Sequence, residues 1–419
     1  MTRPEHTIER VLRWARRTLL VVFGVPMAIG IVMSLVDSYR RRGKKPKPFP
    51  VTAPTTVTVG DGEITTYTFG RDLYADMLSA IESAERRILF ETYIWKGDEV
   101  GERFKTALAD AAARGVEVYC IYDGFANLVV SPAFKRFPPS MKVLRYPIYG
   151  AGWRFFDLGR YGRDHRKILV VDDKVGFVGG YNVGSAYETE WRDTHVRVTG
   201  PGVLDLVRAF ADMWNLHRRR KLMPSERPLL LEAPLSWEPK IRFQRNLPRL
   251  WMFPIRGMYL EAINRASKNV WITQAYFIPD SDFAEALANA ARRGVDVRLL
   301  VPLKSNHVVA DWLSRGYYSQ MLDAGVRIFR FKDAMVHAKT ATVDGLWSTV
   351  GTANIDRLSL QGNYEINVEV IDRDLAGVLE DIWATDESNC IELTHGEWEA
   401  RDLHRRFTEL VLRPLRPML

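Results

Sequence analysis

Cysteine is scarce in this chain, with only Cys120 and Cys390 among 419 residues. Two cysteines so far apart neither build a disulfide framework nor form the cluster that a structural zinc site needs. The sequence also contains no H-E-x-x-H stretch and no Cys/His cluster, which removes the common zinc-enzyme patterns. We therefore expect neither a metal ion nor another cofactor.

The chain also lacks the composition of disordered or fibrous proteins, since 47% of it is hydrophobic and 26% charged. Its length predicts two to three domains of about 150 residues each. Acidic charge is not in excess, because 59 basic residues face 51 acidic ones and the formal net charge is +8. A basic balance indicates an anionic partner, which is nucleic acid, a membrane surface or a phosphate-bearing substrate.

One stretch lacks charge altogether, residues 18–36, which lie between Arg17 and Asp37. As a helix it spans about 28 Å, close to the thickness of a hydrocarbon core of about 30 Å. A buried core helix is the alternative, but the stretch has no polar face and prolines follow it. We therefore predict a transmembrane helix. Five basic residues precede it and six follow before Pro48, so positive-inside reasoning is nearly balanced.

The body of the chain contains one unit twice. ALADAAARGVEV at residues 107–118 recurs as ALANAARRGVDV at residues 286–297. Each copy predicts a helix that ends at Arg-Gly and a buried strand after it, and an apolar strand precedes each helix. This alternation predicts an α/β fold of two halves, each a mixed sheet covered by helices.

The expected domains follow the order of the chain. They are a basic segment (1–17), a transmembrane helix (18–36), a basic and proline-rich linker (37–57), the first half (58–222), an inter-half linker (223–254) and the second half (255–419). The second half ends in an amphipathic stretch, residues 398–412, whose apolar face we expect to pack against the core.

Downstream of each repeated helix, one spaced set of polar residues occurs twice. It reads His-x-Lys, four residues, Asp, six residues, and then Gly-Gly-x-Asn in the first half or Gly-Thr-x-Asn in the second. A carboxylate follows each histidine at the same distance of 28 residues. A doubled set of uncommon residues at matched spacing indicates function rather than chance. The set is His165, Lys167, Asp172, Gly180, Asn182 and Asp193, and in the second half His337, Lys339, Asp344, Thr352, Asn354 and Glu365.

These residue types suit a phosphate. Side chains at i and i+2 of a strand share a face, so each histidine projects together with its lysine. If the halves pack about a pseudo-twofold axis, two imidazoles, two ammonium groups and two amides converge on one pocket. Lysines supply charge, amides donate, and glycine lets backbone N–H groups approach closely. One imidazole can then attack phosphorus while the other protonates the leaving oxygen.

These two stretches resemble the duplicated signature of the phospholipase D superfamily, and their surroundings resemble its bacterial cardiolipin synthase branch. The resemblance runs from about residue 58 to the C-terminus. Thr352 stands where serine is usual in this signature, and one apparent membrane span replaces the pair often found in the branch. The stretches that carry it are FETYIWKGDEVG, HRKILVVDDKVGFVGGYNVG, WRDTHVRVTGP, AYFIPD, HAKTATVDGLWSTVGTANID and NYEINVEV.

The resemblance implies two phospholipase D-like halves that share one active site, and a metal-independent transfer through a phosphohistidine. His165 or His337 would be the nucleophile, with the other as general acid and base. Asp193 and Glu365 would orient the imidazoles.

The remaining residues of the doubled set would surround the phosphate. Asp172 and Asp344 belong to the catalytic signature, although they are expected to stabilise the site rather than touch phosphorus, and turn formation is their alternative role. The expected phosphate-binding residues are Lys167, Lys339, Asn182, Asn354, Gly180 and Thr352.

The predicted activity is therefore cardiolipin synthesis from two phosphatidylglycerol molecules, with glycerol released. A phospholipase D that yields phosphatidic acid, a nuclease of the superfamily and a non-catalytic lipid-binding adaptor are the alternatives. The expected partners are an anionic phospholipid and the membrane, without nucleic acid. We expect a single-pass inner-membrane protein with its catalytic part on the cytoplasmic face, and the sequence leaves its oligomeric state open.

Overall fold

The computed structural model describes residues 47–148, 162–218, 228–229, 239–412 and 414, together with a few positions nearer the N-terminus (14, 28–29, 31–33, 35–36 and 39). The predicted basic segment and most of the predicted transmembrane stretch therefore lie outside the described residues. Among those that are described, no helix combines the length and the apolar character that crossing a bilayer requires.

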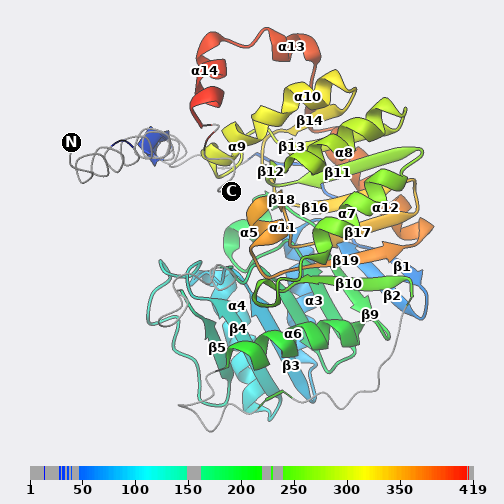
Figure 1. Ribbon diagram of the computed structural model, residues 1–419. Helices are drawn as coiled ribbons and strands as arrows, with labels where there is room; N and C mark the ends of the chain where they lie inside the picture. The colour runs from blue at the N-terminus through cyan, green and yellow to red at the C-terminus, as the bar shows by residue number, and fades with distance from the viewer. Residues whose placement is uncertain are drawn as a thin grey trace, which may run out of the picture.

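Two eight-stranded sheets form the body, one in each half (Figure 1). The elements of the first half are β1 (Thr55–Val59), β2 (Gly62–Tyr67), α3 (Gly70–Glu82), β3 (Arg87–Thr92), α4 (Glu99–Ala113), β4 (Glu117–Asp123), β5 (Lys142–Tyr146), β6 (Ile168–Val171), β7 (Val175–Gly179), α5 (Ser185–Thr189), β8 (Trp191–Arg192), β9 (His195–Thr199) and α6 (Val203–His217). Those of the second half are β10 (Ile241–Asn246), η3 (Pro248–Leu250), α7 (Pro254–Arg265), β11 (Asn269–Gln274), β12 (Phe277–Ile278), α8 (Ser281–Arg292), β13 (Asp296–Pro302), α9 (Val308–Ser314), η4 (Arg315–Tyr317), α10 (Tyr318–Asp323), β14 (Arg327–Phe331), β15 (Met335–Val336), β16 (Lys339–Val343), β17 (Trp347–Gly351), β18 (Ile355–Asp356), α11 (Arg357–Gln361), β19 (Glu365–Ile371), α12 (Arg373–Glu387), β20 (Cys390–Leu393), α13 (His395–Glu399) and α14 (Leu403–Leu412).

The two sheets repeat one strand order. The first reads β2-β9-β7-β6-β3-β4-β5 after its edge strand β1, and the second reads β10-β19-β17-β16-β11-β13-β14 before its edge strand β20. In the first sheet, β3 is parallel to β4, the strand after α4, and antiparallel to β6 on its other side. In the second sheet, β11 is likewise parallel to β13, the strand after α8, and antiparallel to β16. The predicted α/β fold of two related halves with mixed sheets is confirmed.

The repeated helices end at Arg-Gly as the sequence predicts, and the structure shows that both also begin at a capping aspartate. Asp98 accepts a hydrogen bond from the Gly101 amide at the start of α4, and Asp280 does the same for the Phe283 amide at the start of α8. Gly115 and Gly294 follow the two helices with φ of 98° and 89°, a conformation that glycine adopts without a steric penalty. Duplicated caps therefore fix duplicated helix lengths.

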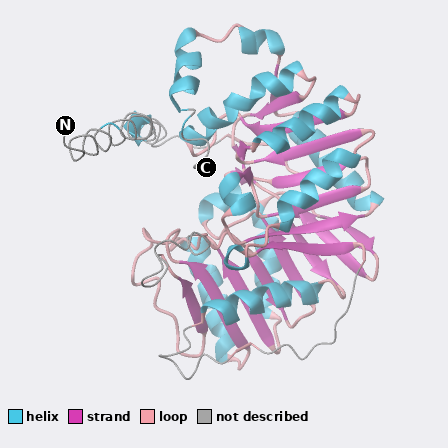
Figure 2. Ribbon diagram, viewed as in Figure 1, coloured by secondary structure: helices cyan, strands magenta, loops and turns pink. Residues whose placement is uncertain are grey.

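The halves pack through a shared core. Apolar side chains of β7, β9, β17 and β19 meet there, together with those of α6 and α12, including Phe210, Trp214 and Leu379. Figure 2 shows helices on the faces of both sheets, and separate clusters fill the outer faces against α3 and α4 in one half and α7 and α8 in the other. This shared core fixes how the two copies of the motif meet.

Two segments differ from expectation. Residues 223–254, expected as a linker, contain β10, which pairs with β19 in the second sheet. The C-terminal stretch forms two helices, of which Trp398 and Leu412 are buried, but Leu403, Phe407 and Leu410 on α14 are 82%, 65% and 62% exposed. The prediction that the apolar residues of this stretch pack against the core is wrong for these three, which face solvent.

Candidate active site

Each predicted histidine is held by the backbone of the opposite half. The His165 amide donates to the Tyr364 carbonyl at 3.1 Å, and the His337 amide donates to the Arg192 carbonyl at 2.6 Å. The short parallel pair of β8 and β15 leads into the second of these bonds. Both histidines lie just before a strand, β6 or β16, rather than within one.

The two orienting carboxylates are exchanged between the halves. His165 Nδ1 lies 3.0 Å from both carboxylate oxygens of Glu365, and His337 Nδ1 lies 2.6 Å from Asp193 Oδ2. The matched 28-residue spacing suggests partners within one half, whereas the structure pairs each histidine with the carboxylate of the other half. A carboxylate at Nδ1 fixes the proton there and leaves the lone pair of Nε2 for a substrate atom.

The two lysines complete one buried cluster. Lys167 Nζ donates to the carbonyl of His165 at 2.5 Å, and Lys339 Nζ donates to the carbonyl of His337. The charges of both lysines act on both imidazoles, in each case opposing protonation. The two His-x-Lys stretches therefore lie together in a single buried site, as the sequence predicts.

Burial dominates the electrostatics of this cluster. It lowers the pKa of His337 to about 3 and that of His165 well below its usual value, with Lys339 and Lys167 adding to the effect. Burial likewise lowers the pKa of Lys167 to about 7 and that of Lys339 to about 8. A lowered pKa favours the neutral form of an imidazole, which is the form that acts as a nucleophile.

The two carboxylates differ in their electrostatics. Burial raises the pKa of Glu365 to about 8 and outweighs the opposing effect of Lys167. Burial acts in the same direction on Asp193, but Lys339 and His337 outweigh it and hold its pKa below the usual value. Glu365 therefore holds its proton to a higher pH than Asp193 does, so the two halves of the site are chemically unequal.

Gly180 and Thr352 lie behind the carboxylates. A Cβ at Gly180 would fall 2.0 Å from Asp193 Oδ1, so only glycine leaves room for this carboxylate. At the equivalent position Thr352 Oγ1 donates to Glu365 Oε2 at 2.5 Å. Both residues thus position an orienting carboxylate, which is a different role from the predicted contact with phosphate.

The two asparagines occupy unequal surroundings. Asn182 Oδ1 accepts from the Ile94 amide at 3.1 Å, next to Tyr93, whose ring lies 4.7 Å from that of His165. Asn354 is also buried, but its Oδ1 has no hydrogen-bond partner within the described part of the chain. Asn182 is therefore fixed in place beside the first histidine, and Asn354 retains unused hydrogen-bonding capacity.

Asp172 and Asp344 do not reach the site. Each sits in the turn at the far end of the strand that follows its histidine, with φ of 52° and 56°. Asp172 accepts from the amides of residues 85, 86 and 87, and Asp344 from those of residues 267, 268 and 269. Their expected place in the catalytic set is wrong: each aspartate ties its turn to the segment leading into β3 or β11, where the backbone amides need an acceptor.

Sequence reasoning missed several aromatic residues of the site. The ring of Trp191 lies 5.1 Å from that of His337, and the ring of Tyr276 lies 6.2 Å from it. Aromatic residues at strand ends are usually core residues, so only their position beside the histidines identifies these two.

Arg192, which directly precedes Asp193, is buried and makes a two-point ion pair with Asp386 of α12, at 2.8 and 2.7 Å. No cluster of metal-ligating side chains is found among the described residues.

Comparisons with known proteins identify relatives of this chain. The family described as "Cardiolipin synthase, PLD-like domain" matches residues 77–214 and 259–386. The chain belongs to this family. Cardiolipin synthases of Clostridium perfringens and Geobacillus thermodenitrificans are 30% and 31% identical to it, over 85% and 84% of this chain and 77% and 71% of theirs. The phosphatidylserine synthase structure of Haemophilus influenzae shares the fold, with a TM-score of 0.63, 15% identity and coverage of 87% of this chain and 95% of that one.

In this PLD-like family member, the arrangement provides two imidazoles, each with a carboxylate at Nδ1, and two lysines in one buried cluster. Such a set can bind a phosphodiester, attack phosphorus from one side and deliver a proton on the other. Nothing in the geometry requires a metal ion for these steps, because the lysines supply the positive charge that a phosphoryl transition state needs.

Proposed function

We propose that this chain is a membrane-bound cardiolipin synthase that transfers a phosphatidyl group from one phosphatidylglycerol to another. The observation that carries the proposal is the pair of exchanged histidine–carboxylate contacts with two lysines in one buried cluster. The relatives at about 30% identity bear the name cardiolipin synthase, which supports the same substrate class.

In the first step, Nε2 of one histidine attacks the phosphorus of the donor. A P–N bond forms, the bond between phosphorus and the headgroup glycerol oxygen breaks, and the second imidazole gives that oxygen a proton so that glycerol leaves. Lys167 and Lys339 are the charges available for the non-bridging phosphoryl oxygens. The raised pKa of Glu365 keeps a proton available beside His165, so His165 is the better initial acid. His337, whose pKa is lowered to about 3, is then the neutral imidazole that attacks phosphorus.

In the second step, the imidazole that has lost its proton takes one from the free hydroxyl of a second phosphatidylglycerol. The resulting oxygen attacks phosphorus, the P–N bond breaks, and cardiolipin is formed. Burial of the site favours this lipid acceptor over water, because His165 and His337 are only 9% and 4% exposed. A site more open to water would favour hydrolysis to phosphatidic acid, the alternative activity.

The membrane placement belongs to the same proposal. The uncharged stretch 18–36 would anchor the chain in the inner membrane as a single pass, with the catalytic halves on the cytoplasmic face. A basic surface then faces anionic lipid, which agrees with the net charge of +8.

The test is lipid turnover by the purified full chain in phosphatidylglycerol vesicles without added metal. Cardiolipin and glycerol in equal amounts are expected from the wild type, and neither from His165→Ala or His337→Ala. A phosphohistidine trapped on one of the two residues would establish the covalent step. Phosphatidic acid as the product would replace the synthase by a phospholipase, and the absence of any lipid product would overturn the lipid reading.

A further inference from the structure

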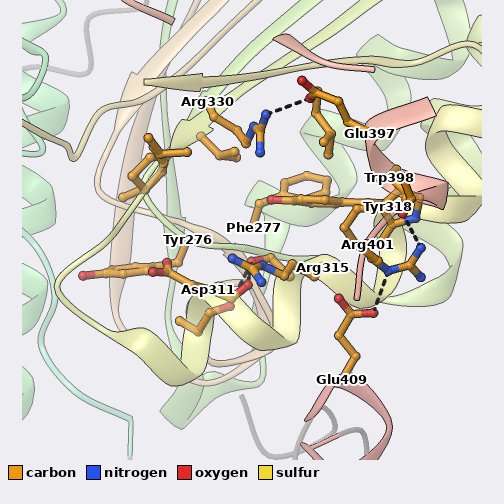
Figure 3. A pocket seen from close by; sticks show the side chains of 18 residues that line it. Tyr276, Phe277, Asp311, Arg315, Tyr318, Arg330, Glu397, Trp398, Arg401 and Glu409 are labelled. Carbon is orange, nitrogen blue, oxygen red and sulfur yellow. Dashed lines mark hydrogen bonds and ion pairs between the residues drawn. The ribbon is translucent and has the colours of Figure 1, made fainter. Parts of the chain in front are cut away.

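A cavity of about 420 Å³ opens in the second half beside the active site. Its wall begins at Tyr276, whose ring lies 6.2 Å from that of His337, and continues over Phe277 and the carboxyl end of β13. Figure 3 shows Phe277, Tyr318 and Trp398 gathered on one side of it, with Tyr276 directed away from them. Its volume falls in the range of ligand pockets, about 300–1,000 Å³.

The matching position in the first half is filled. Trp95 and Phe277 occupy equivalent positions, because each lies three residues before the aspartate that caps the following helix. Each also pairs with the residue that directly follows the asparagine of its motif, Val183 after Asn182 and Ile355 after Asn354. Phe134 and Phe137 pack on Trp95 with ring centroids 5.8 and 5.5 Å away, and only about 10 Å³ remains open. Of these two matching positions in the described part of the chain, only the one on the His337 side keeps a ligand-sized space.

The lining of the cavity is mainly apolar, and its charges cancel. Arg330 pairs with Glu397 at 3.2 Å and Arg401 with Glu409 at 3.4 Å, so these cations are already matched by carboxylates. A site for an anionic headgroup would need an excess of positive charge. An uncharged, elongated group fits this lining better. The charged residues of the wall are Asp311, Arg315, Arg330, Glu397, Arg401 and Glu409.

The cavity also lies beside the part of the chain that suits a bilayer surface. Glu409 of α14 lines it from inside, while Leu403, Phe407 and Leu410 on the other side of this helix are exposed at helical spacing. Exposed apolar residues along one helix face suit the headgroup and acyl boundary. Ile29 and Met33, from the uncharged N-terminal stretch, pack on α9 and Leu412 in the same region.

We infer that this cavity binds a fatty acyl chain of one of the two phospholipids during transfer. The assignment rests on the proposed function for the identity of the lipid, but it makes a separate claim about which residues touch the chain. An acyl chain entering beside α14 would leave the bilayer without crossing water and would place its phosphate toward His337.

A photoreactive phosphatidylglycerol with a diazirine in the acyl chain tests occupancy directly, and it needs no turnover. In vesicles containing the full chain, we expect adducts on peptides that carry Phe277, Ala310 and Tyr318. Adducts confined to other segments would overturn the inference. Labelling of these peptides without any cardiolipin product would instead retain the acyl site and remove the proposed synthase activity.

Filling the cavity gives a second, kinetic test. Ala310→Trp on α9 should reduce turnover of long-chain phosphatidylglycerol about tenfold or more, since each CH₂ kept out of an apolar site costs about fourfold in affinity. Turnover of dihexanoyl phosphatidylglycerol should stay within about twofold of the wild type, because its short chains need little of the cavity.

Two matched variants make this readout decisive. Ala113→Trp, at the exposed end of α4 in the other half, should leave both substrates unaffected. Ala400→Trp fills the same cavity from an exposed position and replaces Ala310→Trp if that variant does not fold. An equal loss for long and short chains would overturn the acyl assignment and favour a headgroup in the cavity, and no loss for either would exclude the cavity from substrate binding.

Discussion

Replacement of Asp193 by asparagine should disable His337, although Asp193 follows His165 in the sequence. The carboxylate is fully buried, and its Oδ2 accepts a hydrogen bond from Nδ1–H of His337, with 2.6 Å between the two heavy atoms. An amide at this position offers its own N–H to Nδ1, which moves the imidazole proton to Nε2 and removes the lone pair that faces the substrate.

The expected loss is large because the change alters the tautomer rather than one weak contact. The same substitution in the triad of serine proteases lowers turnover by about 10⁴. We expect a loss of about 10³- to 10⁴-fold in cardiolipin formation here, which corresponds to about 4–5.5 kcal/mol of transition-state stabilisation. Asp212→Asn, a surface aspartate of α6 that pairs only with Arg245 in the described contacts, serves as the control and should retain wild-type turnover.

Imidazole ¹⁵N spectra of histidine-labelled protein read the pairing independently of turnover. The signals of His337 are identified by their loss in His337→Ala. Asp193→Asn should shift them and leave those of His165 near their original positions, because His165 is bonded to Glu365. The exchanged pairing would be refuted if the His165 signals moved and those of His337 stayed in place.

Three further perturbations test the remaining parts of the site. Gly180→Ala should lower turnover at least about 100-fold without unfolding the chain, as the added Cβ meets Asp193 Oδ1 at 2.0 Å and displaces it; unchanged turnover would mean that this carboxylate can move freely. Asp172→Ala should cost about 1–3 kcal/mol of unfolding free energy by denaturant titration, because three amides lose their acceptor, while turnover per folded molecule stays near wild type; a 10³-fold loss in the folded protein would restore a catalytic role. Burial lowers the pKa of Lys167 to about 7, so its charge is complete below that pH and declines above it. Inhibition by sulfate, whose own charge is constant, should therefore weaken about tenfold or more between about pH 6 and about pH 9, and a pH-independent inhibition constant would contradict this charge change.

Much of the fold could be predicted from the sequence because the duplication is local and strict. The helix at residues 99–113 and its counterpart at 281–292 carry the same alanine pattern, the same capping aspartate and the same terminal glycine. Each of these signals acts within a few residues and does not depend on the rest of the chain. By contrast, β10 was not expected, since its six residues become a strand only by pairing with β19, more than one hundred positions away.

The exposed face of α14 could not be predicted for a related reason. An amphipathic pattern states that one face is apolar, but it does not state what that face contacts. The structure packs Leu412 inward and leaves Phe407 at the surface, next to the cavity that we assign to an acyl chain.

The chemical groups of the site can be read from the amino-acid order alone: two histidines, two lysines and two carboxylates at matched spacing, in two copies of an α/β unit. Which histidine pairs with which carboxylate depends on the folded arrangement of the two halves. Spacing along a chain fixes position within one half, whereas the packing of the two sheets about their shared core brings Glu365 to His165 and Asp193 to His337. The position of Asp172 is local by contrast, because an aspartate five residues beyond a lysine in an extended segment lies about 16 Å from it.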